Sequence, residues 1–214
     1  SRLHRCLGGI GLGADLLYEF APPGVDPLAP ENPLIFASAP LVGTPLTTTA
    51  KYAVVTKSPL TNFIADSLSS SYFALELKRL GVDALVITGQ SPRWMYLAID
   101  GGRVFFREAT HLLGKSATET DSFLRSESNK QGLRVAAIGL AGENGVRFAT
   151  ISNDGRHAGR GGVGAVMGAK RLKAIAIRGD TDTAIADSRA VAELALAMRH
   201  KSISTVTSKY RQIG

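Results

Sequence analysis

The residues best suited to chemistry lie in one glycine-rich stretch in the second half of the chain. It combines two arginines with four glycines: Arg156, Gly159, Arg160, Gly161, Gly162 and Gly164. Glycine lets main-chain N–H groups approach a ligand closely, and a loop that enters a helix directs unpaired N–H groups and the positive end of the helix dipole at one place. Arginine adds charged donors arranged as a fork. The stretch therefore favours an anion-binding loop, for example for phosphate; a tight turn that binds nothing is the alternative.

The same order of elements is predicted twice, in residues 34–89 and 135–179. The paired segments are 34–41 with 135–142, 51–57 with 145–151, a serine-rich loop at 65–71 with the glycine-rich stretch, and 78–89 with 170–179. Two copies indicate a duplication rather than a solenoid. If the copies pack about a pseudo-dyad, their loops face one another, and a ligand with two similar halves or one large flat cofactor would fit between them. A folding duplication whose loops are only turns is the alternative.

Hydrophobic periodicity and turn residues predict the elements that must position these loops. Helices are expected at 14–20, 69–80, 116–127, 163–171 and 187–198. Strands are expected at 34–38, 51–57, 84–88, 95–99, 103–107 and 174–178, with a hairpin turn at Asp100-Gly-Gly and a buried strand at 84–88. In the second helix the residues expected to face the core are Tyr72, Phe73, Leu75, Leu77 and Leu80. Together these elements define an α+β module with an internal duplication.

Composition sets limits on the class of protein. With 214 residues, 44% hydrophobic and 20% charged, the chain is globular and long enough for one large domain or two small ones. No apolar run reaches the roughly 18–20 residues of a membrane span. Cys6 is the only cysteine, so this chain by itself forms no internal disulfide and no iron–sulfur cluster, which favours the cytoplasm. The net charge of +7 is scattered rather than gathered in a basic stripe, which argues against nucleic acid.

Catalytic and metal-binding patterns are not found in the sequence. The histidines do not have metal-ligand spacing: His4, His111, His157 and His200. The sequence also contains no nucleophile elbow, no HExxH motif and no Walker phosphate-binding loop. We therefore predict no catalytic and no metal-ligating residue here, and the duplicated loops remain the candidate site.

Four segments carry a resemblance to a known family: Asp26-Pro-Leu-Ala-Pro-Glu-Asn-Pro-Leu-Ile-Phe-Ala, Tyr52-Ala-Val-Val-Thr-Lys-Ser-Pro-Leu-Thr, Ile138-Gly-Leu-Ala-Gly-Glu-Asn and Gly159-Arg-Gly-Gly-Val-Gly-Ala-Val-Met-Gly-Ala-Lys. Over about residues 7–187 the chain resembles the N-terminal domain of the aldehyde ferredoxin oxidoreductase family, which are tungsten or molybdenum bis-pterin oxidoreductases. The resemblance implies two mainly antiparallel sheets about a pseudo-dyad, with short helices. It also implies that residues 1–187 form the base under a tungstopterin or molybdopterin with a bridging magnesium ion. Residues 188–214 would then begin a following helical domain or form a tail.

The resemblance also implies which residues meet the cofactor: Gly8, Gly9, Lys51, Leu68, Ser70, Arg156, His157, Gly159, Arg160 and Gly161. Several positions depart from the family pattern. Lys51 keeps the charge of the family's arginine without its fork, and Leu68 stands where an asparagine is usual and offers no side-chain oxygen. His157 stands in place of an alanine and Ser70 in place of a glycine. Ile10 replaces an arginine of the first glycine cluster.

Three functions remain open at this point. The first is the cofactor-base domain of an enzyme that oxidises aldehydes to acids and passes electrons to ferredoxin. Its [4Fe–4S] cluster would lie in helical domains outside these residues, so the rest of the same enzyme is a partner, the fragment alone is expected to be inactive, and a homo-oligomer is left open. The second is a non-catalytic binding or scaffold module that kept the fold and lost the cofactor, which Leu68, Lys51 and Ile10 favour. The third, a nucleotide-phosphate binder, rests on charge and glycine loops alone.

Overall fold

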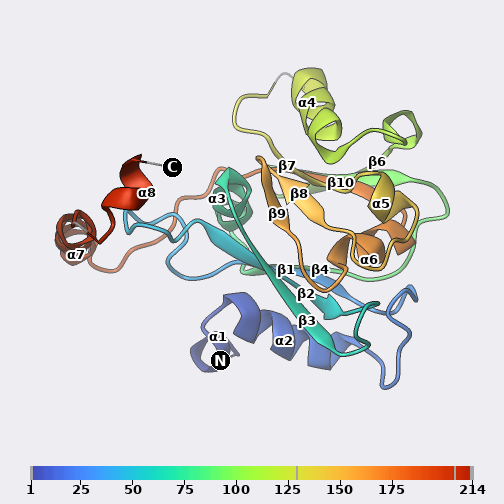
Figure 1. Ribbon diagram of the computed structural model, residues 1–214, viewed down its shortest axis with the longest axis horizontal. Coiled ribbons are helices and arrows are strands. Elements are labelled where there is room, and N and C mark those ends of the chain that lie inside the picture. Colours follow the sequence, from blue (N-terminus) through green and yellow to red (C-terminus); the bar gives the residue numbers. More distant parts are fainter. Residues whose placement is uncertain (1, 129, 205, 213–214) are drawn as a thin grey trace.

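Two β-sheets form the body of the computed structural model, which describes residues 2–128, 130–204 and 206–212 (Figure 1). The small sheet has the order β3-β2-β1-β4, with all neighbours antiparallel. Its strands are β1 (Leu34–Ala37), β2 (Lys51–Lys57), β3 (Ile64–Ser70) and β4 (Ala84–Ile87). The large sheet has the order β6-β5-β10-β7-β8-β9, and its β5–β10 pair is parallel. Its strands are β5 (Met95–Asp100), β6 (Arg103–Glu108), β7 (Arg134–Ala137), β8 (Ile151–Asn153), β9 (Arg156–Ala158) and β10 (Leu172–Arg178).

Helices lie between the two sheets and on their outer faces (Figure 1). Helix α2 (Gly9–Phe20) covers the outer face of the small sheet, and α4 (Ala117–Ser128) covers the outer face of the large sheet. Helices α3 (Tyr72–Arg79) and α6 (Val163–Ala169) lie between the sheets. The other helical segments are α1 (Arg2–Cys6), the 3-10 turn Thr110–Leu112, α5 (Leu140–Glu143), α7 (Ser188–Ser202) and α8 (Ser208–Gln212). Within the described ranges, no helix combines the length and the apolar character that crossing a bilayer requires.

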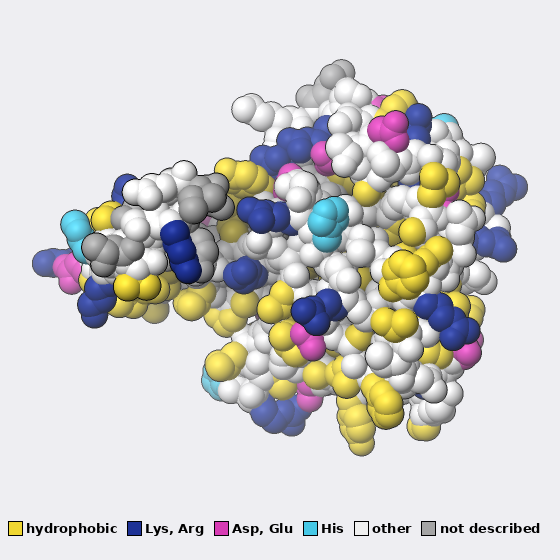
Figure 2. Space-filling view, in the orientation of Figure 1, with side chains coloured by type: hydrophobic (Ala, Val, Ile, Leu, Met, Phe, Trp, Pro, Cys, Tyr) yellow, Lys and Arg dark blue, Asp and Glu magenta, His cyan; other side chains and the backbone are white. Residues whose placement is uncertain are grey.

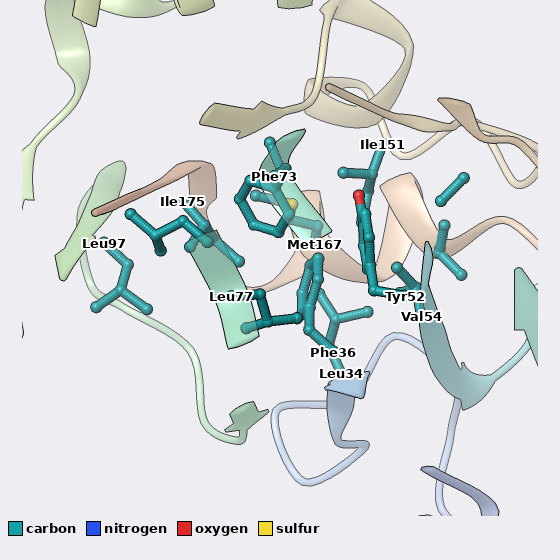
Figure 3. Close-up of a cluster of buried hydrophobic side chains, with 14 of the residues drawn as sticks. Leu34, Phe36, Tyr52, Val54, Phe73, Leu77, Leu97, Ile151, Met167 and Ile175 are labelled. Atoms are coloured by element: carbon teal, nitrogen blue, oxygen red, sulfur yellow. The ribbon is translucent and has the colours of Figure 1, made fainter. Parts of the chain in front are cut away.

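The main core fills the space between the sheets (Figure 3). It is built from the inner faces of both sheets and from α3 and α6, and it includes Leu34, Phe36, Tyr52, Val54, Phe73, Leu77, Ile138, Ile151, Met167 and Ile175. The ring centroid of Tyr52 lies 5.1 Å from that of Phe73 and 6.0 Å from that of Phe36. Burial of each such side chain stabilises the fold by roughly 1.5–3 kcal/mol. The core therefore holds the two sheets at a fixed separation.

The predicted duplication is visible in the sheet topology. The first copy gives the order β3-β2-β1-β4, and the second gives β9-β8-β7-β10. In each copy a helix, α3 or α6, precedes the last strand. The β5–β6 hairpin, predicted from its Asp100-Gly-Gly turn, extends the large sheet beyond β10. The prediction of an α+β fold with two mainly antiparallel sheets and short helices is confirmed.

Two predicted segments differ from the structure. Residues 65–71 were expected to be a loop, but most of them belong to strand β3, in which buried Ser67 and Ser69 alternate with exposed Asp66 and Leu68. Small polar residues at the inward positions conceal the period-two pattern of this strand. Residues 145–151 were expected to be a strand, but they turn until β8 begins, because the Val146 N–H donates to the Ala141 carbonyl and continues the α5 turn.

The limits and burial of other elements also differ in detail. The α3 helix starts at Tyr72, three residues later than predicted, and Tyr72 is 61% exposed rather than inward. Glu76 is buried in its place, because its carboxylate accepts the Gly179 N–H at 2.9 Å. The α2 helix starts earlier than predicted, and an ideal Cβ on Gly13 would lie 2.5 Å from Cγ2 of Val55, so close packing on the sheet requires glycine there. Strand β4 is half-buried rather than buried, since it is an edge strand.

The segment after β10 leaves the body of the molecule. Helix α7 projects away from the two sheets (Figure 1), and among its residues only Ala195 is buried. The side chain of Asp187, the residue before α7, caps the first turn by accepting a hydrogen bond from the Ala190 N–H at 2.8 Å. The predicted helix at 187–198 is thus confirmed, while the assignment of residues 188–214 to a following domain stays a prediction.

Candidate functional site

Side chains from three strands converge on one cleft at the edge of the two sheets, which we call the β3–β9 cleft. It has a volume of about 350 Å³ and is lined by Lys51, Leu68, Ser69, Ser70, Gly155, Arg156 and His157. Strands β3 and β9 belong to different sheets, and they occupy the same place in the two copies of the duplicated unit. The cleft therefore brings together the predicted residues Lys51, Leu68, Ser70, Arg156 and His157.

Strand alternation explains why these side chains reach the cleft. On β2 and β3 the pairs Lys51–Ser70 and Tyr52–Ser69 are in register, so inward Tyr52 and Ser69 leave Lys51 and Ser70 facing outward. Leu68, two residues before Ser70, has the same orientation and is 51% exposed.

On the large sheet a tight turn presents the other half of the cleft. Asp154 and Gly155 have φ values of 45° and 71°, as a two-residue hairpin turn requires at both central positions. The turn joins β8 to β9, and Asn153 pairs with Arg156 across it. Arg156 and His157 follow directly and are both exposed. The His157 Nδ1 atom lies 2.8 Å from the Ser152 hydroxyl, which fixes the ring orientation.

The cleft is positively charged. The side chains of Lys51 and Arg156, which line the cleft, have no hydrogen-bond or ion-pair partner among the described residues, nor does that of Arg160, which lies beyond β9 and outside the lining. The Asp154 carboxylate nearby is already engaged, since it accepts the Phe73 N–H at 3.0 Å and lies 3.4 Å from Nη1 of Arg134. Like charges that converge without a counter-charge repel one another, so such a cluster favours an anion between them.

One further carboxylate lies near the cleft on β3. Asp66 lies on the same face of β3, two residues before Leu68, and is exposed. Figure 2 shows Lys and Arg side chains spread across the face on which β3 and β9 lie. A second cleft of about 650 Å³ shares Lys51, Ser70 and Arg156, and its lining also includes Asp154 and the threonines at positions 44, 48 and 49.

The glycine-rich stretch is built differently from the predicted anion loop. The Arg160 N–H donates to the Ser67 hydroxyl at 2.9 Å, and the Gly164 N–H donates to the Ala149 carbonyl at 2.9 Å. An ideal Cβ on Gly162 would lie 2.0 Å from the Arg147 carbonyl oxygen. The Arg160 and Gly164 N–H groups thus bond within the protein, and Gly162 serves close packing, while an anion-binding role of the stretch stays a prediction. Gly159 and Arg160 remain exposed just after β9, and Gly161 is half-buried.

The predicted residues Gly8 and Gly9 do not line the β3–β9 cleft. They form the start of α2, where the Gly9 N–H donates to the Ser38 carbonyl at 2.6 Å. Ser38 follows β1, whose end is in register with Ala53 of β2, so both glycines lie toward the same end of the small sheet as Lys51. Their assignment to the cofactor stays a prediction.

The buried residues behind the cleft were missed by sequence reasoning. Asn153 is 2% exposed and accepts hydrogen bonds from Tyr52 and Ser69 on the opposite sheet. The Asp-Gly dipeptide at 154–155, set between two strand-forming segments, was the signal that would have identified this hairpin and its flanking residues.

The chemistry of the donor set fits a multiply charged phosphate. The lysine, the arginine, the serine hydroxyls and the imidazole that line the cleft are donors that suit phosphate oxygens. In the described part of the chain, no group of three or more His, Cys, Asp or Glu side chains is arranged to hold a metal ion. The residues that line the cleft thus suit phosphate or another anion.

The fold and the cleft define a duplicated α+β domain with a positively charged cleft at one edge. The family model described as "Aldehyde ferredoxin oxidoreductase, N-terminal domain" matches residues 1–179. The chain therefore belongs to the aldehyde ferredoxin oxidoreductase family.

Curated relatives agree with this family. The tungsten-containing aldehyde ferredoxin oxidoreductase of Pyrococcus furiosus is 49% identical over 186 residues, which are 86% of this chain and 31% of that protein. The enzyme of the same name from Thermococcus kodakarensis gives the same identity and coverage. The WOR-like subunit of an aliphatic sulfonate oxidoreductase from Pyrococcus furiosus is 37% identical over 193 residues. The chain spans about a third of the length of these relatives.

A solved structure shares the whole fold. It is described as the active site complex BamBC of benzoyl coenzyme A reductase with 1,5-dienoyl-CoA. The TM-score is 0.88 at 39% sequence identity, and the match covers 99% of this chain and 32% of the other. The fold described above is thus that of a domain within a larger protein chain.

Proposed function

We propose that this chain is the cofactor-binding N-terminal domain of an oxidoreductase that oxidises aldehydes to carboxylic acids. In this proposal the β3–β9 cleft receives phosphate groups of a tungstopterin or molybdopterin. The observation that carries it is the convergence of Lys51 and Arg156, from opposite sheets, on one cleft without a partner among the described residues. The tungsten-containing relatives support the identity of the cofactor, and their names support aldehydes as the substrate class.

Each residue of the cleft has a distinct part in this proposal. Arg156 offers a bidentate fork to a phosphate from the large sheet, and Lys51 offers a point charge from the small sheet. Ser70 adds a hydroxyl, and Arg160 adds charge just beyond β9. Leu68 supplies no oxygen from its side chain, so a bridging magnesium ion would depend on main-chain carbonyls, such as that of His157, and on the phosphates.

The chain's contribution is to bind and orient. When bound, the metal–pterin group supplies the redox chemistry, which a protein side chain does not perform by itself. The core behind the cleft keeps Lys51 and Arg156 at a fixed separation before any ligand arrives, so that little conformational entropy is lost on binding. The remaining domains of the enzyme and ferredoxin are the partners in this proposal.

Elemental analysis tests the proposal. The 214-residue chain is purified without oxygen from cells supplied with tungstate and molybdate, and tungsten, molybdenum and phosphorus are measured. We expect one of the metals together with phosphorus in the wild type, and loss of both in Lys51→Ala/Arg156→Ala. The control is Arg189→Ala/Lys201→Ala, which removes the same charge from exposed positions on α7 and should retain both elements.

A wild-type chain without metal and without phosphorus would contradict cofactor binding by these residues. That result would favour the second candidate, a non-catalytic module that kept the fold. The observation on its side is Leu68, an apolar side chain 51% exposed in the middle of the cleft.

A further inference from the structure

A buried polar network joins the two sheets directly behind the β3–β9 cleft. Its centre is Asn153, whose side-chain oxygen accepts the Tyr52 hydroxyl at 2.8 Å and the Ser69 hydroxyl at 2.9 Å. The Asn153 amide donates to the Ser71 hydroxyl, which in turn caps α3 by accepting the Phe73 N–H at 3.0 Å. Figure 3 shows the Tyr52 ring crossing the core with its oxygen beside Ile151 of β8. One side chain of the large sheet thus binds two strands and one helix start of the small-sheet copy.

The buried partners of Asn153 are neighbours in sequence of the cleft residues. Tyr52 follows Lys51, and Ser69 lies between Leu68 and Ser70. Because side chains alternate along a strand, an inward residue that is held in place fixes the outward residues next to it. Asn153 itself pairs with Arg156 across the hairpin turn. On β2 and β3 the inner network and the outer cleft are thus two faces of the same strands, whereas on the β8–β9 hairpin Asn153 and Arg156 are cross-strand partners on one face.

Asp154 adds a second link at the turn. Its carboxylate accepts the Phe73 N–H and lies 3.7 Å from Nη1 of Arg125 in addition to its pair with Arg134. The turn that carries Arg156 is thereby held against the start of α3. Without these links, the edge strands β3 and β9 would be joined across the cleft mainly by the Arg160 N–H bond to Ser67.

We propose that Asn153 is a positioning residue for phosphate binding: it sets the separation between Lys51 and Ser70 on one sheet and Arg156 on the other. The inference rests on the proposed function, since it concerns the same cleft. Asn153 does not itself touch the ligand, and it acts through the register of β2, β3 and β9. A residue that only stabilised the fold would change unfolding without changing the affinity of the folded protein.

The experiment is calorimetric titration of the 214-residue chain with inorganic pyrophosphate. We expect Asn153→Ala to weaken binding about tenfold while the protein remains folded, and Arg156→Ala to weaken it at least as much. In the Arg156→Ala background, Asn153→Ala should have little further effect, because the separation that Asn153 sets matters only while Arg156 is present on the other side. Leu124→Ala is the control, because it shortens a buried side chain of α4. It should lower the free energy of unfolding without changing the affinity for pyrophosphate.

A second variant tests the same role in case the Asn153→Ala protein does not fold. Tyr52→Phe/Ser69→Ala keeps the packing and removes both hydroxyls that donate hydrogen bonds to Asn153. This double variant should weaken pyrophosphate binding several-fold. Unchanged affinity in a folded Asn153 variant, or an equal loss with and without Arg156, overturns the positioning role alone. Absence of pyrophosphate binding by the wild type overturns the proposed function, and the positioning role with it.

Discussion

A glycine-to-alanine change at position 168 tests whether close backbone packing holds the glycine-rich segment in place. Gly168 lies in α6, and an ideal Cβ there would be 1.9 Å from the carbonyl oxygen of Gly142 in α5. An ordinary carbon–oxygen contact is about 3.4 Å, so α6 must withdraw from α5 by more than an ångström. Overpacking of this kind costs about 1–3 kcal/mol, and more when the obstacle is backbone.

Helix propensity acts in the opposite direction. Alanine is favoured over glycine inside a helix by about 1 kcal/mol. We therefore expect Gly168→Ala to lower the free energy of unfolding by about 2 kcal/mol net. For a chain of this size that corresponds to a fall in the unfolding temperature of roughly 4–8 °C.

Urea unfolding followed by the fluorescence of Trp94, the single tryptophan, measures this loss. Gly159→Ala is the control, because the nearest atoms to its added Cβ are 3.9 Å away and it should change stability by less than about 0.5 kcal/mol. A Gly168→Ala protein as stable as the wild type, or more stable, would refute the close-packing argument.

Three further changes probe buried and exposed lysines. Lys173→Met should lower the free energy of unfolding by about 3–5 kcal/mol, because it leaves Glu143 without the fully buried ammonium that pairs with it. In urea unfolding, the Lys173→Met/Glu143→Gln double variant should lose less free energy than the two single variants together. Burial lowers the pKa of Lys170 from 10.5 to about 8. The unfolded chain therefore binds more protons than the folded chain between these two pH values, and the free energy of unfolding rises with pH across that window, by at most about 3 kcal/mol. Lys170→Met should flatten this rise in urea unfolding midpoints measured from pH 8 to 10. Lys51→Arg should tighten pyrophosphate binding several-fold by adding a fork, whereas Lys201→Arg on α7 should leave it unchanged, and equal affinities in a titration would contradict the role of Lys51.

Local signals predicted the elements whose period or turn is self-contained. Strand β2 was predicted with its exact limits, and the β5–β6 hairpin follows from Asp100-Gly-Gly. Strand β3 was missed because its inward residues Ser67 and Ser69 are polar. Their burial makes sense only once Arg160 and Asn153, more than 80 residues away, satisfy the hydroxyls. Long-range hydrogen bonding of this kind leaves no periodic trace in the sequence.

The cleft was predictable in part. The duplicated pattern indicated that equivalent segments of the two copies face one another, and β3 and β9 do so as strands rather than as loops. The role of the glycine-rich stretch stays a prediction, because glycine serves close packing as well as ligand approach. Sequence alone does not say which neighbour a glycine meets, here the Arg147 carbonyl for Gly162.

The duplication supplies a similar edge on each side of the cleft, but the two sides differ in chemistry. The small sheet contributes the point charge of Lys51, the hydroxyl of Ser70 and the apolar Leu68, whereas the large sheet contributes Arg156 and His157. A ligand with two similar halves would therefore be held unequally, with the stronger, bidentate contacts on the β9 side. Asn153 belongs to the hairpin that carries those contacts and bonds to the strands that carry the weaker ones. The affinity for phosphate should thus depend more on Arg156 than on Lys51. Because the network behind the cleft joins the strands that carry them, the contribution of each side chain to that affinity depends on where the other is held.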